Sequence, residues 1–492
     1  MNFNSIDFLI FFPIIAVLNY VVPTKFRYIP LLIFSYYFYM SWNPDLVFLI
    51  LFTTAVSYFS GILIEKYPQD VFKRKLFLTI SIVASLAVLF FFKYYNFLAG
   101  GVSSLLSLFG GTADLTIEGL VLPVGISFYT FQTLSYSIDV YRRNIPAERN
   151  FFYYALFVSF FPQLVAGPIE RPENLLPQLK QAHKFNYNNF SVGMKRVMAG
   201  FFKKVVVADI AGTYVNGVFN SPESATGAAV VVASMLFAVQ IYCDFSGYTD
   251  IAIGCARIMG YKLMQNFERP YSATNIKDFW SRWHISLTSW FKDYLYIPLG
   301  GNRKGKARMF VNLFIVFLVS GLWHGADLTF ILWGALHGIY RVVGELTAKK
   351  RNRLYEKMGL SVSSMSVTLF RRFITFILVC FAWIFFRANN VSDLGILLSK
   401  LVSDFGGISF VSDMGFTLSS VLILALSIIL MCMIDKRFTF AEYDRESGER
   451  IGLDAFVFVV WAVMFAWILI IGGDSTSSIA SSGASAFIYF QF

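Results

Sequence analysis

Histidine is the side chain best suited to proton transfer near neutral pH, and this chain of 492 residues contains only four of them: His183, His284, His324 and His337. Three of the four fall between residues 284 and 337. An imidazole with its ordinary pKa near 6.5 can accept a proton from a hydroxyl group, a role typically worth about 10²–10⁴ in rate. The 284–337 stretch is therefore the first place to look for acid–base chemistry.

His324 lies in the segment Gly321–Asp327, between two apolar runs. If this segment is helical, Asp327 is at i+3 and can accept a hydrogen bond from one ring nitrogen, which leaves the other nitrogen as a proton acceptor. Polar residues at bilayer depth are costly and mark either function or internal pairing. His324 is accordingly the leading candidate for a general base, and the alternative is a buried histidine that only pins two helices together.

His337 is the second candidate, thirteen positions further along in the segment Trp333–Gly338. The glycines that flank it permit close helix packing. A structural hydrogen bond is at least an equal alternative for this residue.

The segment Asp278–Tyr294 is rich in tryptophan and has the spacing of an amphipathic helix. Its apolar face follows i, i+4, i+8, i+11, i+15, while Asp278 and Arg282 form an i, i+4 pair on another face. The apolar positions are Phe279, Trp283, Leu287, Trp290 and Tyr294. Such a helix suits an anchor in the membrane interface or the wall of an active-site cavity, and both interpretations stay open.

Other chemistry-bearing groups have simpler explanations. Asp244 and Asp250 follow an apolar run six positions apart, which is not one helical face, so we expect helix capping and buried hydrogen bonds there. The four cysteines lie singly in apolar stretches without ligand spacing, so we expect them to be buried, with no metal site. Gly473–Ser475 is expected to be a turn, and the lack of a credible serine or cysteine nucleophile argues against a self-contained acyl-enzyme hydrolase.

The elements that must hold these residues are membrane helices. Only 14% of the residues are charged and 57% are hydrophobic. Soluble domains average about 25% charged and 45–50% apolar residues, so the composition excludes a soluble enzyme, a disordered chain and a fibre. We predict an all-α, polytopic integral membrane helical bundle.

Apolar runs of spanning length predict about ten to twelve membrane segments. Two of them are interrupted by proline and glycine, at Pro123–Gly125 and Pro162–Pro168, and are expected to be re-entrant because broken backbone needs partners inside the protein. The predicted segments are 6–22, 29–43, 46–64, 76–98, 121–140, 152–168, 226–242, 309–323, 326–345, 370–386, 415–434 and 454–472.

Basic loops predict the sidedness, because cytoplasmic connections carry an excess of Lys and Arg. The connection 99–119 contains none, and the alternation puts the N-terminus outside. The net charge of +11 is explained by this topology and by contact with anionic lipid, without a nucleic-acid partner. The basic stretches are Lys25–Arg27, Lys66–Lys75, Arg142–Arg149, Lys180–Lys204, Arg303–Arg308 and Lys349–Arg353.

Taken together, these segments resemble the membrane-bound O-acyltransferase superfamily, and within it the bacterial branch that O-acetylates alginate and other polysaccharides. The resemblance covers nearly the whole chain. It is carried by the segments Leu122–Gln132, Phe161–Ile169, Asp244–Asp250, Asp278–Gly301, Gly321–Ala326, Trp333–Gly338 and Phe487–Phe492.

The resemblance implies one membrane-embedded acyltransferase domain over 1–492, with N-terminal spans in 1–120, a catalytic core in 121–345 and C-terminal spans in 346–492. It implies a helical funnel around a central intramembrane histidine, which matches His324, and a second motif histidine, which matches His284. We expect the substrate channel to be lined by Asp278, Trp280, Arg282, Trp283, Asp293, Trp323, Asp327 and His337.

The resemblance also implies a bacterial cytoplasmic membrane enzyme that moves acetyl groups to an extracellular or cell-wall polysaccharide. The donor would be acetyl-CoA or a related acyl-CoA, acting as substrate with no bound cofactor. The partners would be membrane lipid, glycan synthesis proteins and a secreted serine-hydrolase-like acetyltransferase, which the missing nucleophile makes reasonable.

Three other functions compete with this one. A D-alanyl transferase for teichoic acid belongs to the same superfamily, but the stretch after Asp293 and the length of the chain favour the O-acetylation branch. A transporter or flippase would use interior polar residues to bind substrate, and would show inverted repeats that we do not find. A eukaryotic-type lipid or protein acyltransferase is the third.

Overall fold

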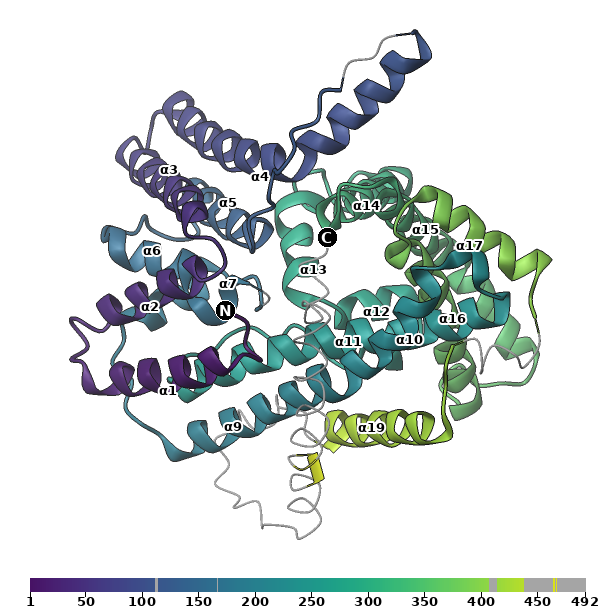
Figure 1. Ribbon diagram of the computed structural model, residues 1–492. Coiled ribbons are helices and arrows are strands. Elements are labelled where there is room, and N and C mark those ends of the chain that lie inside the picture. Colours follow the sequence, from purple (N-terminus) through teal and green to yellow (C-terminus); the bar gives the residue numbers. More distant parts are fainter. Residues whose placement is uncertain (111–113, 166, 407–413, 438–462, 465, 467–492) are drawn as a thin grey trace. The chain divides into compact units, whose positions relative to one another are not determined.

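The computed structural model describes residues 1–110, 114–165, 167–406, 414–437, 463, 464 and 466 (Figure 1). Every regular element in these ranges is a helix, so the all-α prediction is confirmed. The stretches long and apolar enough to cross a membrane are Pro44–Lys66, Val71–Leu108, Gly227–Ile258, Gly305–His324, Met365–Arg387 and Leu418–Asp435. The chain is a polytopic membrane protein. The predicted segment 454–472 and the turn at Gly473–Ser475 lie outside the described residues, apart from 463, 464 and 466.

The chain divides into two compact units. Unit 1 comprises Met1–Val197 and Tyr248–Met264, and unit 2 comprises Met198–Gly247 and Gln265–Phe492. The helices that begin in unit 1 are α1 (Ile6–Val21), α2 (Tyr28–Met40), α3 (Val47–Lys66), α4 (Val71–Leu108), α5 (Ile126–Arg142), α6 (Phe151–Ser159), α7 (Phe161–Leu164), α8 (Pro172–Lys180) and α9 (Tyr187–Phe201).

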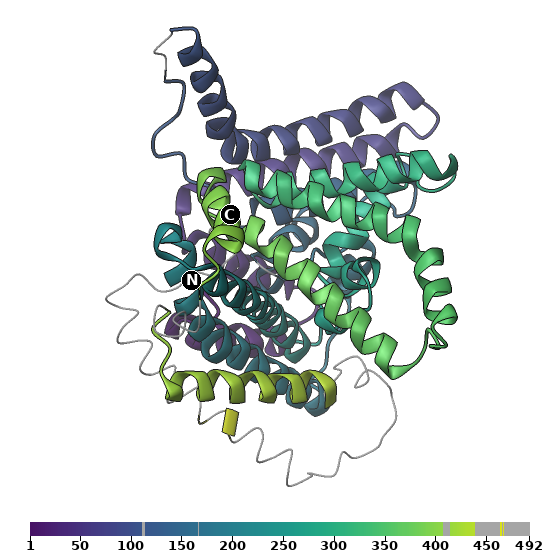
Figure 2. The same ribbon diagram turned by 90° about the vertical axis from the view of Figure 1, so that its right-hand side faces the viewer.

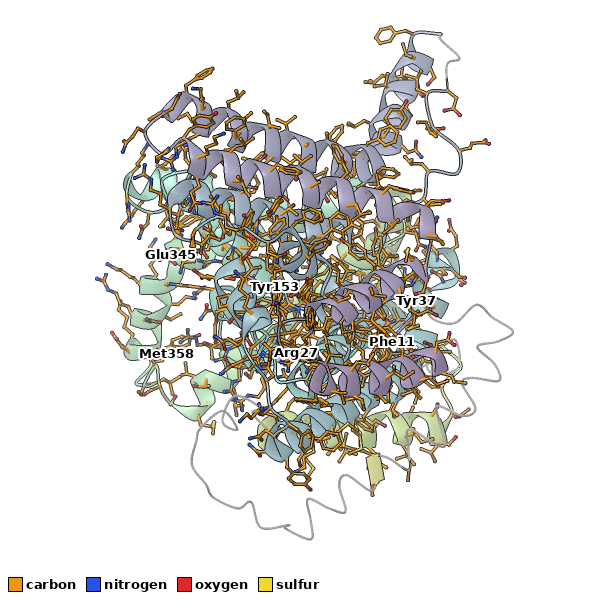
Figure 3. All side chains as sticks on the ribbon, turned by 90° about the vertical axis from the view of Figure 1, so that its left-hand side faces the viewer. Phe11, Arg27, Tyr37, Tyr153, Glu345 and Met358 are labelled. Atoms are coloured by element: carbon orange, nitrogen blue, oxygen red, sulfur yellow. The ribbon has the colours of Figure 1, made fainter. Side chains whose placement is uncertain are left out.

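Within unit 1, α3 packs against α4 and α5, and α2 packs against α1 and α6. Aromatic side chains join these helices: Phe11 of α1 and Tyr37 of α2 stack with ring centroids 6.3 Å apart (Figure 3). Polar side chains pair inside the unit, as where the Tyr154 hydroxyl donates to Ser57 Oγ at 2.7 Å. Helix α4 runs to Leu108, ten residues past the predicted end, because the sequence after Gly100 stays apolar and lacks proline.

The interruptions predicted from proline and glycine are present. Helix α5 begins after Gly125, whose φ of 75° only glycine adopts easily. Helix α6 ends at Ser159 and α7 restarts at Phe161, whose amide donates to Ser35 Oγ at 3.1 Å. Gln163 Nε2 donates to the Phe157 carbonyl at 2.6 Å. The protein thus supplies hydrogen-bond partners to the broken backbone, as an apolar environment requires.

Unit 2 holds most of the remaining helices, and α11 (Gly227–Ile258) passes through both units. The others are α10 (Asp209–Phe219), α12 (Ile276–Arg282), α13 (Ile285–Phe291), α14 (Gly305–His324), α15 (Leu328–Lys357), α16 (Met365–Arg387), α17 (Val391–Ser403) and α19 (Leu418–Arg437). Two π-helical segments, Phe202–Ala208 and Lys292–Tyr296, interrupt the α-helical geometry. Helix α15 includes the basic stretch Lys349–Arg353, which the sequence had indicated as a loop.

Helices α14 and α15 form a tight pair and lie side by side (Figure 1, Figure 2). A Cβ on Gly334 would lie 2.3 Å from the Phe317 carbonyl oxygen, and one on Gly321 would lie 2.3 Å from the Phe330 carbonyl oxygen. Only glycine at both positions allows the two backbones to approach this closely. The predicted role of the glycines near His337 is confirmed.

The expectation that the basic residues lie in inter-helix loops is wrong for the end of the stretch Lys180–Lys204. Lys203 and Lys204 lie in the first π-helical segment and are almost fully buried. Lys204 Nζ is 2.7 Å from Asp209 Oδ1 and 2.7 Å from Asp244 Oδ1, while Lys203 Nζ is 2.9 Å from Asp435 Oδ1. Buried cations require such partners, because desolvation is otherwise too costly.

The capping prediction for Asp244 and Asp250 is also wrong. Both residues lie inside α11, because the apolar run continues on either side of them without a breaker. The predicted buried pairing is confirmed: Asp244 pairs with Lys204 in unit 2, and Asp250 Oδ1 is 2.9 Å from Arg196 Nε in unit 1. The two carboxylates serve different pairs, as their spacing of six residues requires.

We predict that Gly334→Val separates α14 from α15 and lowers the thermal stability of the detergent-solubilised protein. The added side chain overlaps the Phe317 carbonyl, and overpacking typically costs about 1–3 kcal/mol. Gly344→Val is the matched control, because a Cβ at Gly344, on the same helix, meets nothing within 4 Å. Equal melting temperatures for the two variants would contradict the tight crossing.

We predict that Lys204→Met destabilises unit 2 strongly, by about 3–5 kcal/mol, because two buried carboxylates lose their cation. Lys400→Met is the control, since Lys400 pairs at 2.9 Å with the half-exposed Asp404 and such surface pairs contribute about 0–1 kcal/mol. Unfolding in a denaturant series reports both values. If Lys204→Met lowers the free energy of unfolding no more than Lys400→Met does, the buried ion pairs of Lys204 do not stabilise the protein.

Candidate active site

The three clustered histidines all lie in unit 2 but on different elements. His324 is the last residue of α14 and is 4% exposed. Its ring meets Trp333 edge-on at a centroid distance of 5.1 Å and Phe386 at 5.3 Å. Helix α14 ends here because Gly325 is extended, so the imidazole lies at a helix terminus inside an aromatic cluster.

The predicted i+3 relation between His324 and Asp327 is absent. Asp327 is the N-cap of α15, and its Oδ1 accepts from the Thr329 amide at 2.8 Å. An aspartate two residues after a glycine favours capping the next helix over continuing the first. Asp327 therefore starts α15 and fixes the turn that follows His324.

The segment Asp278–Tyr294 is not one continuous helix, so that part of the prediction is wrong. Helix α12 ends at Arg282, His284 takes a left-handed φ of 45°, and α13 begins at Ile285. The apolar positions Phe279, Trp283, Leu287 and Trp290 are nevertheless all buried. The periodicity identified the buried residues correctly, but the break turns His284 inward.

Asn266 holds this break in place. Its Oδ1 accepts from the Ser286 amide at 3.2 Å and from Ser286 Oγ at 2.9 Å, and lies 3.1 Å from His284 Nδ1. The backbone amide identifies the acceptor atom as oxygen, so His284 Nδ1 must carry the proton. In the neutral ring Nε2 is then the basic nitrogen.

Burial and aromatic contacts shape the surroundings of His284. Complete burial lowers the pKa of His284 to about 3, which keeps the ring neutral. Phe245 meets the ring edge-on at 4.7 Å. Trp323 has its centroid 6.0 Å from His284 and 4.9 Å from His324. One indole therefore contacts both motif histidines.

His337 has the opposite tautomer. The Trp280 indole N–H donates to His337 Nδ1 at 3.2 Å, so that nitrogen is the acceptor and Nε2 carries the proton. Trp333 lies 4.9 Å from the ring. Since the basic nitrogen of His337 is already engaged, the geometry favours the packing role that the sequence left open.

The remaining channel candidates lie in three different settings. Trp280, Trp283 and Trp323 belong to the buried aromatic cluster with Trp333 and Trp383. Asp278 and Arg282 instead form their predicted pair at 2.6 Å on a partly exposed face of α12, where Asp278 also accepts from the Thr274 amide at 2.9 Å. Asp293 is half-buried in the second π-helical segment.

Several residues of this site were missed by the sequence analysis. Asn266 precedes His284 by 18 positions and has no local pattern that marks it. Phe245, Trp383 and Phe386 come from distant helices. Phe245 and Trp333 had a signal, because they lie in the segments Asp244–Asp250 and Trp333–Gly338 that carry the family resemblance.

The potential metal ligands and the cysteines can be followed in the part of the chain that the structure describes. There, no group of three or more His, Cys, Asp or Glu side chains is placed to hold a metal ion. Cys243, Cys255 and Cys380 are buried as predicted, but Cys432 is exposed, because it lies on the outer face of α19.

Comparison with known proteins identifies the class. Residues 83–386, which include all three clustered histidines, match the model of the membrane-bound O-acyltransferase family. The chain belongs to this family and is a membrane-bound acyltransferase.

The chain is similar to named proteins that O-acetylate glycans and, over a shorter stretch, to D-alanyltransferases. It is 34% identical over 500 residues to the probable alginate O-acetylase AlgI of Pseudomonas putida, covering 100% of both chains. It is 35% identical over 423 residues to the peptidoglycan O-acetyltransferase of Helicobacter pylori, covering 80% of this chain and 78% of that protein. A teichoic acid D-alanyltransferase of Bacillus subtilis is 29% identical over 289 residues, covering 55% of this chain and 70% of that protein.

We predict that Asn266→Leu lowers acyl transfer by about tenfold or more, because losing a buried hydrogen-bond partner costs about 1–3 kcal/mol and releases the His284 tautomer. Asn266→Asp retains an acceptor oxygen and is expected to restore part of the rate. The control Asn390→Leu removes the N-cap of α17, an exposed position in the same unit, and is expected to keep activity. Equal activity of Asn266→Leu and wild type at matched protein levels would contradict a positioning role.

Proposed function

We propose that this chain transfers acetyl groups from a cytoplasmic donor, acetyl-CoA or a related acyl-CoA, for the O-acetylation of an extracellular or cell-wall polysaccharide. It acts in the bacterial cytoplasmic membrane with its N-terminus outside. His324 is the general base and His284 assists it.

The observation that carries the proposal is the position of His324. His324 is a buried imidazole at the end of α14, a helix that is long and apolar enough to span a membrane. It also lies within the residues that match the family model. The full-length similarity to a probable alginate O-acetylase supports acetyl as the group and a polysaccharide as the final acceptor.

The chemistry requires a basic ring nitrogen on His324, which lies among aromatic side chains. A ring nitrogen of His324 takes the proton of the acceptor hydroxyl, and the oxygen attacks the thioester carbonyl. The thiolate of the donor leaves and takes the proton back from the imidazolium. Holding thioester and hydroxyl at attack distance supplies much of the rate through proximity, and the proton transfer adds about 10²–10⁴.

The partners follow from the separation of donor and polymer by the membrane. Acyl-CoA is cytoplasmic and polyanionic, whereas the polymer is modified outside. We propose that a secreted serine-hydrolase-like acetyltransferase receives the acetyl group and passes it to the glycan, next to glycan synthesis proteins and membrane lipid. No cofactor and no nucleic acid take part.

We predict that His324→Ala abolishes ester acetate on secreted and cell-wall glycans while the protein still inserts and accumulates. His284→Ala is expected to weaken transfer. His183→Ala is the matched control: this half-buried histidine lies in unit 1, 2.8 Å from the Gln178 carbonyl through Nε2, and is expected to retain transfer. Mass spectrometry after mild alkaline release measures the acetate.

The alternatives predict different results. Alanine in place of acetate among the released esters would identify a D-alanyl transferase, as in the Bacillus subtilis relative. Unchanged acetate in a deletion strain and in His324→Ala would refute O-acetylation, and a transport signal that survives His324→Ala would indicate a transporter or flippase.

A further inference from the structure

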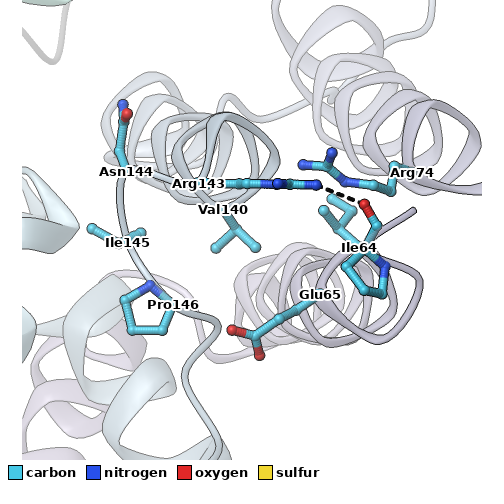
Figure 4. A pocket seen from close by; sticks show the side chains of 9 residues that line it. Ile64, Glu65, Arg74, Val140, Arg143, Asn144, Ile145 and Pro146 are labelled. Carbon is cyan, nitrogen blue, oxygen red and sulfur yellow. Dashed lines mark hydrogen bonds between the residues drawn. The ribbon is translucent and has the colours of Figure 1, made fainter. Parts of the chain in front are cut away.

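A cavity of about 400 Å³ opens in unit 1, where α3 ends, α4 begins and α5 ends (Figure 4). Part of its wall is apolar, from side chains that include Ile64, Val140 and Ile145. Its polar part comes from Arg74, Arg143 and Glu65. The cavity is separate in sequence from the histidine cluster, which belongs to unit 2.

Two arginines face each other in this cavity. The side chains of Arg74 and Arg143 point toward one another (Figure 4). Arg143 donates to the Pro68 carbonyl at 2.6 Å, and Arg74 donates to the Tyr141 carbonyl. These neutral acceptors orient the guanidinium groups without cancelling their charge. Over the described residues, no carboxylate lies within ion-pair distance of Arg74 or Arg143.

The one carboxylate in the wall is already engaged. Glu65 forms an ion pair with Arg149, which lies outside the cavity, and also accepts from the Ala147 amide at 3.3 Å. Its negative charge is thus balanced elsewhere. Two facing guanidinium groups repel one another, and each can bind a phosphate through parallel N–H donors, which makes a phosphate the anion that best fits between them.

The position of the cavity suits a lipid. It opens beside the start of α4, a helix that is long and apolar enough to span a membrane. The exposed apolar row of α4, Leu76, Ile80 and Val83, lies on the opposite side of the helix from Arg74. A lipid whose phosphate lies between the arginines would therefore contact the apolar side chains of the cavity wall itself, next to its headgroup.

We propose that this cavity binds the phosphate of an anionic phospholipid between Arg74 and Arg143. Basic pockets between membrane helices are a known form of lipid-headgroup site, and each basic residue near an anionic surface contributes a factor of about five in affinity. The free phosphate ion shares the headgroup chemistry but has no apolar part to contact the apolar wall.

The test is native mass spectrometry of the full-length protein in detergent, titrated with phosphatidylglycerol, phosphatidylcholine or inorganic phosphate. We expect phosphatidylglycerol to bind more tightly than phosphatidylcholine, and R74Q/R143Q to weaken it by about thirtyfold. Glutamine keeps a donor for each carbonyl. The control R351Q/R353Q removes the same charge from exposed positions on α15 and is expected to bind like wild type.

A second variant keeps the test decisive if R74Q/R143Q fails to fold. E65Q retains both arginines and releases Arg149 from its ion pair, which leaves one more uncompensated positive charge beside the cavity, so it is expected to tighten phosphatidylglycerol binding about fivefold. The proposal would be overturned if phosphatidylglycerol and phosphatidylcholine bound with equal affinity. It would also be overturned if R351Q/R353Q weakened phosphatidylglycerol binding as much as R74Q/R143Q does, or if E65Q did not tighten it. Displacement of the lipid by inorganic phosphate at millimolar concentration would assign the cavity to free phosphate instead.

Discussion

The constraint on which this structure depends is that its polar groups must find partners inside the protein, because its helices face an apolar surrounding. The broken backbone at Phe160 is satisfied by Ser35 and Gln163, and the buried Lys204 by two aspartates. The same constraint fixes His284 on Asn266. These partners come from other elements, and local sequence alone does not reveal them.

The site in unit 2 combines a rigid scaffold with imidazoles that lie among aromatic side chains. The glycine crossing of α14 and α15 places Trp333 beside His324, and Trp323 contacts both motif histidines. In such an apolar cluster electrostatic interactions are stronger than in water. The aromatic carbon atoms around the histidines neither accept nor donate protons. The aromatic rings thus do more than fill volume, because they limit which atoms can exchange protons with the histidines.

Composition and periodicity predicted much of the fold, including the helical class, the breaks at proline and glycine, and the burial of Phe279 and Trp283. They failed where a distant partner decides the outcome. Lys203 and Lys204 resemble loop charges until Asp435 and Asp244 are seen beside them. The helix over 278–294 looks continuous until Asn266 stabilises its break at His284. The funnel around His324 and the single-domain division stay predictions.

The pairing of Lys203 also sets an order on biosynthesis. Asp435 lies on α19 and forms an ion pair with Lys203. It also accepts a hydrogen bond from the hydroxyl of Tyr242, which precedes it by 193 positions. Lys204, by contrast, meets Asp209 only five positions later. While the chain emerges from the ribosome, one lysine can complete its ion pair at once, whereas its neighbour waits for a helix near the end. Helix α19 is thus required to complete the buried ion pair of Lys203.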